Sequence, residues 1–210
     1  MVGRSGSGKT TLVKLLMRFY DLSSGEILID GINIKDFTKD TLRGFTGMVP
    51  QEPILFNNTI FYNIGYGKDN PRLKEVREAA KIANIDGFIE SLPKKYDTEV
   101  GERGVKLSGG QKQRLAIARM ILSDPDIVIF DEATSQLDSE SEKLIQEAFW
   151  KARAGKTTII VAHRLSTVMR ADKIVVMEKG KIKEIGTHKS LLDTKDSLYS
   201  HFWNLQIKLD

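Results

Sequence analysis

The spacing of apolar residues along the chain predicts short buried strands that alternate with amphipathic helices. Nearly continuous apolar runs at 126–131 and 157–162 are typical of parallel strands in the middle of a sheet, with helices covering both faces. Between these runs, Ser139 and Glu142 have the spacing of a capping box, and apolar residues then recur at helical spacing over 144–149. This alternation of strand, helix and strand predicts an α/β core.

Two segments have the pattern of β-hairpins. In 25–34, two β-prone runs flank Asp30 and Gly31, a residue pair that readily supplies the positive φ of a tight turn. In 173–185, a similar pair of runs turns near Gly180. We therefore expect two antiparallel hairpins beside the parallel core.

Two further helices are predicted from apolar spacing and from helix-start residues. Leu12, Leu16 and Phe19 recur at helical spacing after a glycine-rich segment, which predicts a loop that leads into a helix. Asn70 is a favourable N-cap, and Pro71 is favourable at the first helical position. A helical insertion is therefore predicted to begin at these two residues.

Composition is that of a globular protein. The chain has 210 residues, of which 40% are hydrophobic and 29% charged, and it contains no cysteine, which excludes disulfides. Its apolar runs are far shorter than the roughly 20 residues that cross a bilayer. The net charge of +4 arises from 32 basic and 28 acidic residues that are interleaved, so we expect a mixed, solvated surface and no nucleic-acid partner.

The first candidate site is a glycine-rich loop at the start of the chain. Residues 3–10 fit the pattern G-x-x-x-x-G-K-[ST], whose backbone N–H groups curl around phosphate oxygens at a helix N-terminus. Lys9 should bind the β and γ phosphates, and the hydroxyl of Thr10 is placed to ligate Mg²⁺. The residues predicted to hold the nucleotide here are Gly3, Arg4, Ser5, Gly6, Ser7, Gly8, Lys9, Thr10 and Thr11.

Two adjacent carboxylates form the second candidate site. Asp131 ends an apolar run, which places it at the C-terminal edge of a strand, where ligands bind in open α/β sheets. We predict Asp131 as the second metal anchor. Glu132 follows directly and is predicted as the general base that deprotonates or orients the attacking water.

A second anion-binding helix start is predicted at 107–111. A hydroxyl and two glycines precede a helical run there, as at the phosphate loop. The residues concerned are Ser108, Gly109, Gly110 and Gln111. One chain therefore carries two phosphate-binding elements, which requires an explanation.

These motifs resemble those of the nucleotide-binding domain of the ABC superfamily, and the resemblance covers essentially all 210 residues. It implies one ABC ATP-binding domain with a P-loop NTPase core, a mostly parallel sheet flanked by helices, and an α-helical signature subdomain. The core is expected over about 1–50 and 124–210, and the Gln51 loop with the helical subdomain over about 51–123.

The resemblance also implies roles for residues that spacing alone does not single out. It implies a head-to-tail dimer, homo- or heterodimeric, in which ATP on one phosphate loop is capped by the 107–111 signature of the second nucleotide-binding domain. Gln51 would sense the metal and the attacking water, His163 would contact the γ-phosphate, and Asp138 would lie across the interface. The catalytic set is then Glu132, His163 and Gln51, and the metal ligands are Thr10, Gln51 and Asp131.

Three segments, 51–56, 98–104 and 161–166, resemble the exporter branch of the superfamily. That branch implies Mg²⁺-dependent ATP hydrolysis at the cytoplasmic face of a membrane. It also implies a transmembrane domain that docks through coupling helices and exports a substrate that the sequence does not identify.

Two alternatives stay open at this point. One is a soluble ABC-type ATPase that acts on chromosomes or ribosomes, although the stretch between Lys9 and Ser108 lacks the sustained heptads of the chromosomal type. The other is a hydrolytically impaired nucleotide-binding fragment. Only Met1 and Val2 precede Gly3, where the family has a complete strand and an adenine-stacking aromatic residue, so we expect an incomplete N-terminal β-subdomain.

Overall fold

The computed structural model describes residues 1–101, 104–132, 139–153, 155–162 and 164–207. The chain divides into two compact units, residues 1–44 with 159–210 and residues 45–158, and each unit is described by itself. No helix within these described ranges is both long enough and apolar enough to cross a membrane.

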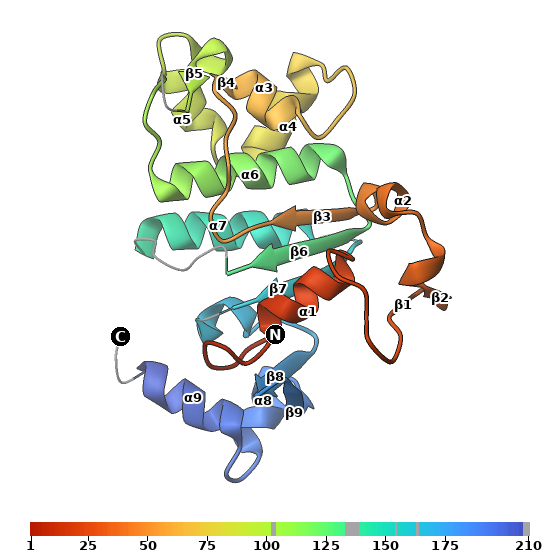
Figure 1. Cartoon of the computed structure of the whole chain (residues 1–210). Helices are drawn as coiled ribbons and strands as arrows, with labels where there is room; N and C mark the ends of the chain where they lie inside the picture. The colour runs from red at the N-terminus through yellow and green to blue at the C-terminus, as the bar shows by residue number, and fades with distance from the viewer. Residues whose placement is uncertain (102–103, 133–138, 154, 163, 208–210) are drawn as a thin grey trace. The chain divides into compact units, whose positions relative to one another are not determined.

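The second unit holds a layer of helices against a parallel strand pair. Strand β3 pairs in parallel with β6, and the sheet has the strand order β3-β6-β7. Helix α6 packs against β3 and against the helices α3, α4 and α7 (Figure 1). The elements are β3 (Thr46–Val49), β4 (Asn58–Thr59), α3 (Ile60–Gly65), α4 (Leu73–Ile82), α5 (Asp86–Ser91), a 3-10 turn (Lys95–Asp97), β5 (Glu99–Val100), α6 (Gly109–Ser123), β6 (Ile127–Asp131) and α7 (Ser139–Ala152). Strand β7 (Thr157–Val161) begins in this unit and ends in the first.

The core of this unit follows from apolar runs that are buried on both faces. Four of the five residues of β6 are buried, and Phe130 stacks on Phe149 of α7 with ring centroids 3.9 Å apart. Full burial of a phenylalanine side chain contributes about 2–3 kcal/mol to the free energy of unfolding. The predicted strand at 126–131 is therefore confirmed as a core strand.

The first unit contains the N- and C-terminal segments. Its elements are α1 (Lys9–Leu16), β1 (Leu28–Ile29), β2 (Ile32–Asn33), a 3-10 turn (Ile34–Asp36), α2 (Lys39–Gly44), a second 3-10 turn (Leu165–Val168), β8 (Ile174–Glu178), β9 (Lys181–Gly186), α8 (His188–Asp193) and α9 (Leu198–Ile207). The β1–β2 and β8–β9 pairs are antiparallel, which confirms both predicted hairpins. An apolar cluster that includes Val2, Val176 and Tyr199 fills this unit.

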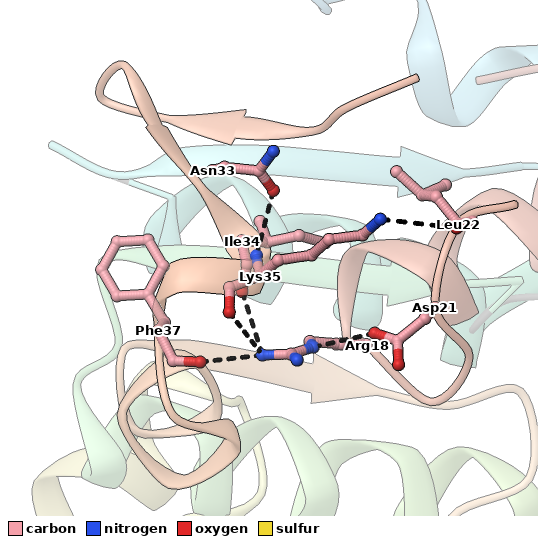
Figure 2. A network of polar contacts seen from close by, with 7 residues as sticks. All are labelled: Arg18, Asp21, Leu22, Asn33, Ile34, Lys35 and Phe37. Atoms are coloured by element: carbon pink, nitrogen blue, oxygen red, sulfur yellow. Dashed lines mark hydrogen bonds and ion pairs between the residues drawn. The ribbon is translucent and has the colours of Figure 1, made fainter. Parts of the chain in front are cut away.

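The prediction for the first helix is wrong at its end. Helix α1 stops at Leu16, and Phe19, which was expected on its apolar face, is 50% exposed. The helix stops because Arg18 adopts a left-handed conformation with φ 50°. Its guanidinium donates to Asp21 and to the carbonyls of Ile34, Lys35 and Phe37 (Figure 2). Val13 and Met17 are the apolar residues that α1 and its C-cap bury.

Two predicted helix starts are also wrong. Helix α4 has Arg72, not Asn70, as its N-cap, because the Glu75 carboxylate accepts from the Arg72 amide at 2.8 Å. Pro71 instead lies against Gly65 at the end of α3. Helix α7 begins at Ser139, which is therefore its first residue and not its cap.

One strand was misjudged and another was not predicted. The segment 157–162 forms the predicted strand β7, but only its last residue, Val161, is buried, so the expected cover on both faces is incomplete. Strand β3 has no clear apolar run, because Thr46 and Gly47 interrupt it. Gly47 is required there by close packing, since a Cβ would lie 2.5 Å from Pro125.

Candidate functional site

The phosphate loop follows an isolated β-bridge at Val2 and enters helix α1, both in the first unit. Val2 bonds in parallel to β8, its amide donating to Val175 O at 2.9 Å and its carbonyl accepting from the Met177 amide at 2.9 Å. The carbonyl of Met1 accepts from the amide of Ala162. Residues 3–8 therefore connect a strand position in a parallel arrangement to the first turn of α1, as the motif requires.

Glycine is necessary at two positions of this loop. Gly3 has φ 151°, and a Cβ at this position would lie 2.2 Å from the carbonyl oxygen of Met177. Gly8 has φ 99°, is the N-cap of α1, and provides no side chain to cap the helix. No side chain therefore caps the start of α1, and a glycine-rich helix start of this kind is the arrangement that binds phosphate.

The Lys9 side chain turns back over the loop. It is 4% exposed, and its Nζ donates to Gly3 O at 2.9 Å and to Arg4 O at 3.1 Å. A buried ammonium ion needs such acceptors, because an unpaired charge in the interior is costly. The loop therefore carries a fixed positive charge at the place where the motif predicts phosphate oxygens.

The remaining loop residues differ in exposure. Ser7 is 4% exposed, and its carbonyl accepts from the Gly180 amide at 3.0 Å, which ties the loop to the β8–β9 turn. The side chains of Arg4, Ser5, Thr10 and Thr11 are exposed, as are the atoms of Gly6. Thr10 and Thr11 are thus accessible to solvent on the first turn of α1.

The carboxylates and Gln51 belong to the second unit, where the β3–β6 register brings them to one edge. Val49 and Phe130 are partners in the parallel ladder. Asp131 follows Phe130 and Gln51 follows Val49 by two residues, so both lie at the carboxyl edge of the same strand pair. Asp131 is 6% exposed, whereas Gln51 is exposed.

Glu132 has a strained backbone. Its φ of 51° is left-handed, which is uncommon for a residue with a long side chain and costs on the order of 1–3 kcal/mol. Strain of this kind persists only where the surrounding structure imposes it, and it occurs preferentially at functional sites. Glu132 directly follows the buried Asp131, and its left-handed backbone gives its carboxylate a different direction from that of Asp131.

The 107–111 segment begins α6 with a complete capping box. Ser108 is the N-cap, its Oγ accepts from the Gln111 amide at 3.2 Å, and Gln111 Oε1 accepts from the Ser108 amide at 2.9 Å. Ser108 and Gly109 are exposed. Gly110 is buried, and a Cβ there would lie 2.7 Å from Ser141 Oγ of α7, so close helix packing is a second reason for this glycine.

Two predicted site residues, Asp138 and His163, lie outside the described residues. The same holds for Glu102 and Arg103 of the predicted exporter segment 98–104. The described part of that segment pairs with the stretch after Gln51, because β5 is antiparallel to β4. All these roles remain predictions.

The sequence did not single out Gln113. This residue lies on the buried face of α6 and donates through Nε2 to the carbonyls of Pro50 and Gln51 at 3.0 and 2.6 Å. Gln113 and Arg114 are the two polar side chains in the run 113–118, all of which is buried, and only their burial in the structure marks them.

Comparison with known proteins agrees with this geometry. The ABC transporter family profile matches residues 1–135. The chain belongs to the ABC transporter family. It therefore carries the ATP-binding domain of an ABC transporter, and the predicted P-loop NTPase fold is confirmed.

Relatives of this ABC domain are longer proteins. A Staphylococcus aureus protein (strain NCTC 8325 / PS 47) named "Putative multidrug export ATP-binding/permease protein" is 58% identical over 205 residues, which are 98% of this chain. A protein of the same name from strain bovine RF122 / ET3-1 is 57% identical. A solved structure, a bacterial Atm1-family ABC exporter with ATP bound, is 50% identical with a TM-score of 0.92, and this chain covers 36% of it. The chain spans about 35% of the length of the curated relatives.

Proposed function

We propose that this ABC domain hydrolyses ATP in a Mg²⁺-dependent reaction and drives an exporter. The observation that carries the proposal is the phosphate loop. Its helix start has no side-chain cap, its Lys9 ammonium group is buried and donates to Gly3 O, and Gly3 leaves no room for a side chain. A triphosphate is the ligand whose charge and size suit such a loop, because it offers oxygens to both the backbone and the lysine.

The donor set suits Mg²⁺, which prefers oxygen ligands and is commonly held by one or two protein groups together with substrate phosphates. Thr10 offers a hydroxyl, Asp131 a carboxylate and Gln51 an amide oxygen. Bound there, the metal would neutralise charge on the β and γ phosphates. The protein residues supply positioning: Lys9 binds phosphate oxygens, and Asp131 is held at the strand edge.

Glu132 is the general base of this proposal. A carboxylate next to the metal anchor accepts the proton of the attacking water while Asp131 remains with the metal. Gln51 and His163 orient the water and the γ-phosphate. Because the left-handed backbone at Glu132 points its side chain independently of Asp131, the two carboxylates can have different tasks.

A head-to-tail dimer explains why one chain has two phosphate-binding elements. The Ser108–Gln111 turn starts α6, a helix of 15 residues, and leaves Ser108 and Gly109 accessible to a ligand on another subunit. ATP shared between the phosphate loop of one subunit and this turn of the other favours closure. Hydrolysis removes the γ-phosphate contacts and favours opening.

The exporter assignment is supported by the names of the relatives and by one surface of the second unit. A cavity of about 510 Å³ lies beside the Gln51 segment, and its lining includes Ile54, Leu55, Val105 and Leu107. We propose that coupling helices of a transmembrane domain dock there, which places the domain at the cytoplasmic face of the membrane.

Two substitutions separate binding from chemistry. Lys9→Ala removes the ammonium ion from the phosphate loop and should abolish binding of a fluorescent ATP analogue. Glu132→Gln should leave that binding intact while phosphate release falls at least about 100-fold, the contribution typical of a positioned general base. Undiminished phosphate release by Glu132→Gln would remove this residue from the base role.

A further inference from the structure

The segment 50–56, which contains Gln51, is held mainly through its backbone. It follows β3 and precedes β4, and it belongs to no helix or strand. Backbone carbonyls outside regular structure need other partners when water does not reach them. Side chains from α6 and α3 supply these partners.

Gln113 holds the start of this segment. It is 3% exposed, and its Nε2 donates to Pro50 O at 3.0 Å and to Gln51 O at 2.6 Å. Its Oε1 is buried without a hydrogen-bond partner among the residues that the structure describes. The two backbone carbonyls are thus the hydrogen-bond partners of the Gln113 amide group, and these hydrogen bonds offset the cost of burying it.

Arg119 and Asn63 hold the end of the segment. Arg119 Nη1 donates to Ile54 O at 3.3 Å, and its Nε donates to Asn63 O at 2.7 Å. Asn63 in turn accepts from the Phe56 amide at 2.9 Å and donates to the Phe56 carbonyl at 3.0 Å. Helix α6 therefore contacts both ends of the segment, through Arg119 at Ile54 and through Gln113 at Pro50 and Gln51.

Packing alone does not account for Gln113. The next residue, Arg114, is also buried, and the three that follow, Leu115, Ala116 and Ile117, are buried and apolar, as expected for a core face. A methionine would fill a similar volume without burying an amide oxygen that lacks a donor. The polar side chain is explained by the carbonyls that it binds.

We propose that Gln113 is a positioning residue that couples the signature turn to Gln51. Gln113 lies one helical turn after Gly109, so it is rigidly connected to the Ser108–Gln111 turn. In the proposed function, that turn binds the nucleotide of the second subunit, while Gln51 contacts the metal on its own nucleotide. Gln113 thereby connects the two nucleotide sites that one chain serves, and this inference rests on the proposed function.

The test compares Gln113→Met with Gln113→Lys in the 210-residue chain. Methionine keeps the volume but removes both donors, whereas lysine restores donors for the two carbonyls. Gln146→Met is the matched control, because Gln146 lies on α7 and donates to Glu142 Oε1 within that helix. If Gln113→Met does not fold by circular dichroism, Gln113→Asn replaces it, since asparagine keeps the amide but is too short to reach both carbonyls.

The first readout is nucleotide binding, which does not require turnover. Affinity for a fluorescent ATP analogue is measured with and without Mg²⁺. Gln113→Met should require about tenfold more Mg²⁺ for half-saturation, the loss typical of a residue that orients a metal ligand, with Mg²⁺-free affinity unchanged. Gln113→Lys should recover most of the loss, and Gln146→Met should match the parent.

The second readout is hydrogen exchange of the peptide that covers residues 50–56, measured without nucleotide. Its amides should exchange faster in Gln113→Met than in the parent or in Gln146→Met. The double variant Gln51→Ala/Gln113→Met separates coupling from a general structural effect. If Gln113 acts independently of Gln51, the effects of the two substitutions on the Mg²⁺ requirement add. Coupling predicts that Gln113→Met has no further effect on Mg²⁺ dependence once Gln51 is absent.

Three results would overturn the inference. The first is an unchanged Mg²⁺ requirement in Gln113→Met. The second is an additive effect of the two substitutions on the Mg²⁺ requirement of the double variant. The third is a nucleotide affinity of the parent chain that does not depend on Mg²⁺. Failure of the proposed function is distinct, because a parent that binds Mg²⁺ and nucleotide without releasing phosphate refutes hydrolysis and leaves the binding and exchange tests valid.

Discussion

At the scale of single residues, the phosphate loop depends on the absence of side chains as much as on Lys9. Gly3 faces the Met177 carbonyl so closely that a Cβ would lie 2.2 Å from it, and the same carbonyl belongs to the strand that pairs with Val2. The loop can therefore give way only by breaking the strand pairing that positions it.

Gly3→Ala should destabilise the chain by about 1–3 kcal/mol, because the added methyl group overpacks the strand and the backbone is left-handed. Urea unfolding measures this change. Gly44→Ala is the control, because nothing lies within 4 Å of a Cβ at this helical glycine. It should stabilise by up to about 1 kcal/mol. Equal stability of the two variants would contradict the geometry of the loop.

Much of the nucleotide site could be predicted from single residues because the motifs are local in sequence. Residues 3–10 and 107–111 each combine glycines, a polar group and a helix start, and the structure has this local form at both. Gln113 and the close approach of Gly110 to Ser141 could not be predicted, because each depends on a contact with a residue far along the chain.

At the scale of elements, the ends of helices are fixed by long-range polar contacts that apolar spacing does not reveal. Arg18 ends α1 by donating to carbonyls of the 34–37 turn (Figure 2). Glu184 of β9 caps α9, accepting from the amides of Leu198 at 2.6 Å and Tyr199 at 3.0 Å. The positions of α1, α4, α6 and α7 were thus predictable, whereas the start or end of α1, α4 and α7 was not.

Arg18→Ala should destabilise the chain by about 2 kcal/mol, because three carbonyls lose a charged donor that lies partly buried against them. Thermal unfolding in parallel with Lys14→Ala provides the comparison. Lys14 is exposed on α1, and the loss of its side chain should change the free energy of unfolding by less than about 0.5 kcal/mol. If both variants unfold alike, the Arg18 contacts contribute nothing.

Glu184→Ala should loosen the start of α9, since two helix amides lose their acceptor, at a cost of about 1–2 kcal/mol. Hydrogen exchange at Leu198 and Tyr199 reports this directly and should accelerate. Glu178→Ala serves as the control, because its contact with Lys183 is at 3.9 Å on a partly exposed surface. Unchanged exchange in Glu184→Ala would show that α9 is held by packing alone.

At the scale of the whole molecule, the central claim is that two copies of the domain form the active unit. The phosphate loop belongs to one compact unit of the chain, and the signature turn, Asp131 and Glu132 belong to the other. In the proposed function, the chain binds ATP through the phosphate loop and caps the ATP of a second copy through the signature turn. We therefore expect the rate of phosphate release per chain to depend on the encounter of two chains.

The most direct measurement is Mg²⁺-dependent phosphate release by the purified chain over a wide range of protein concentration, with Glu132→Gln as the control. The account predicts that the rate per chain rises with concentration as dimers form, reaches a plateau, and is absent in Glu132→Gln. A rate per chain that is independent of concentration, or equal turnover in Glu132→Gln, would contradict it.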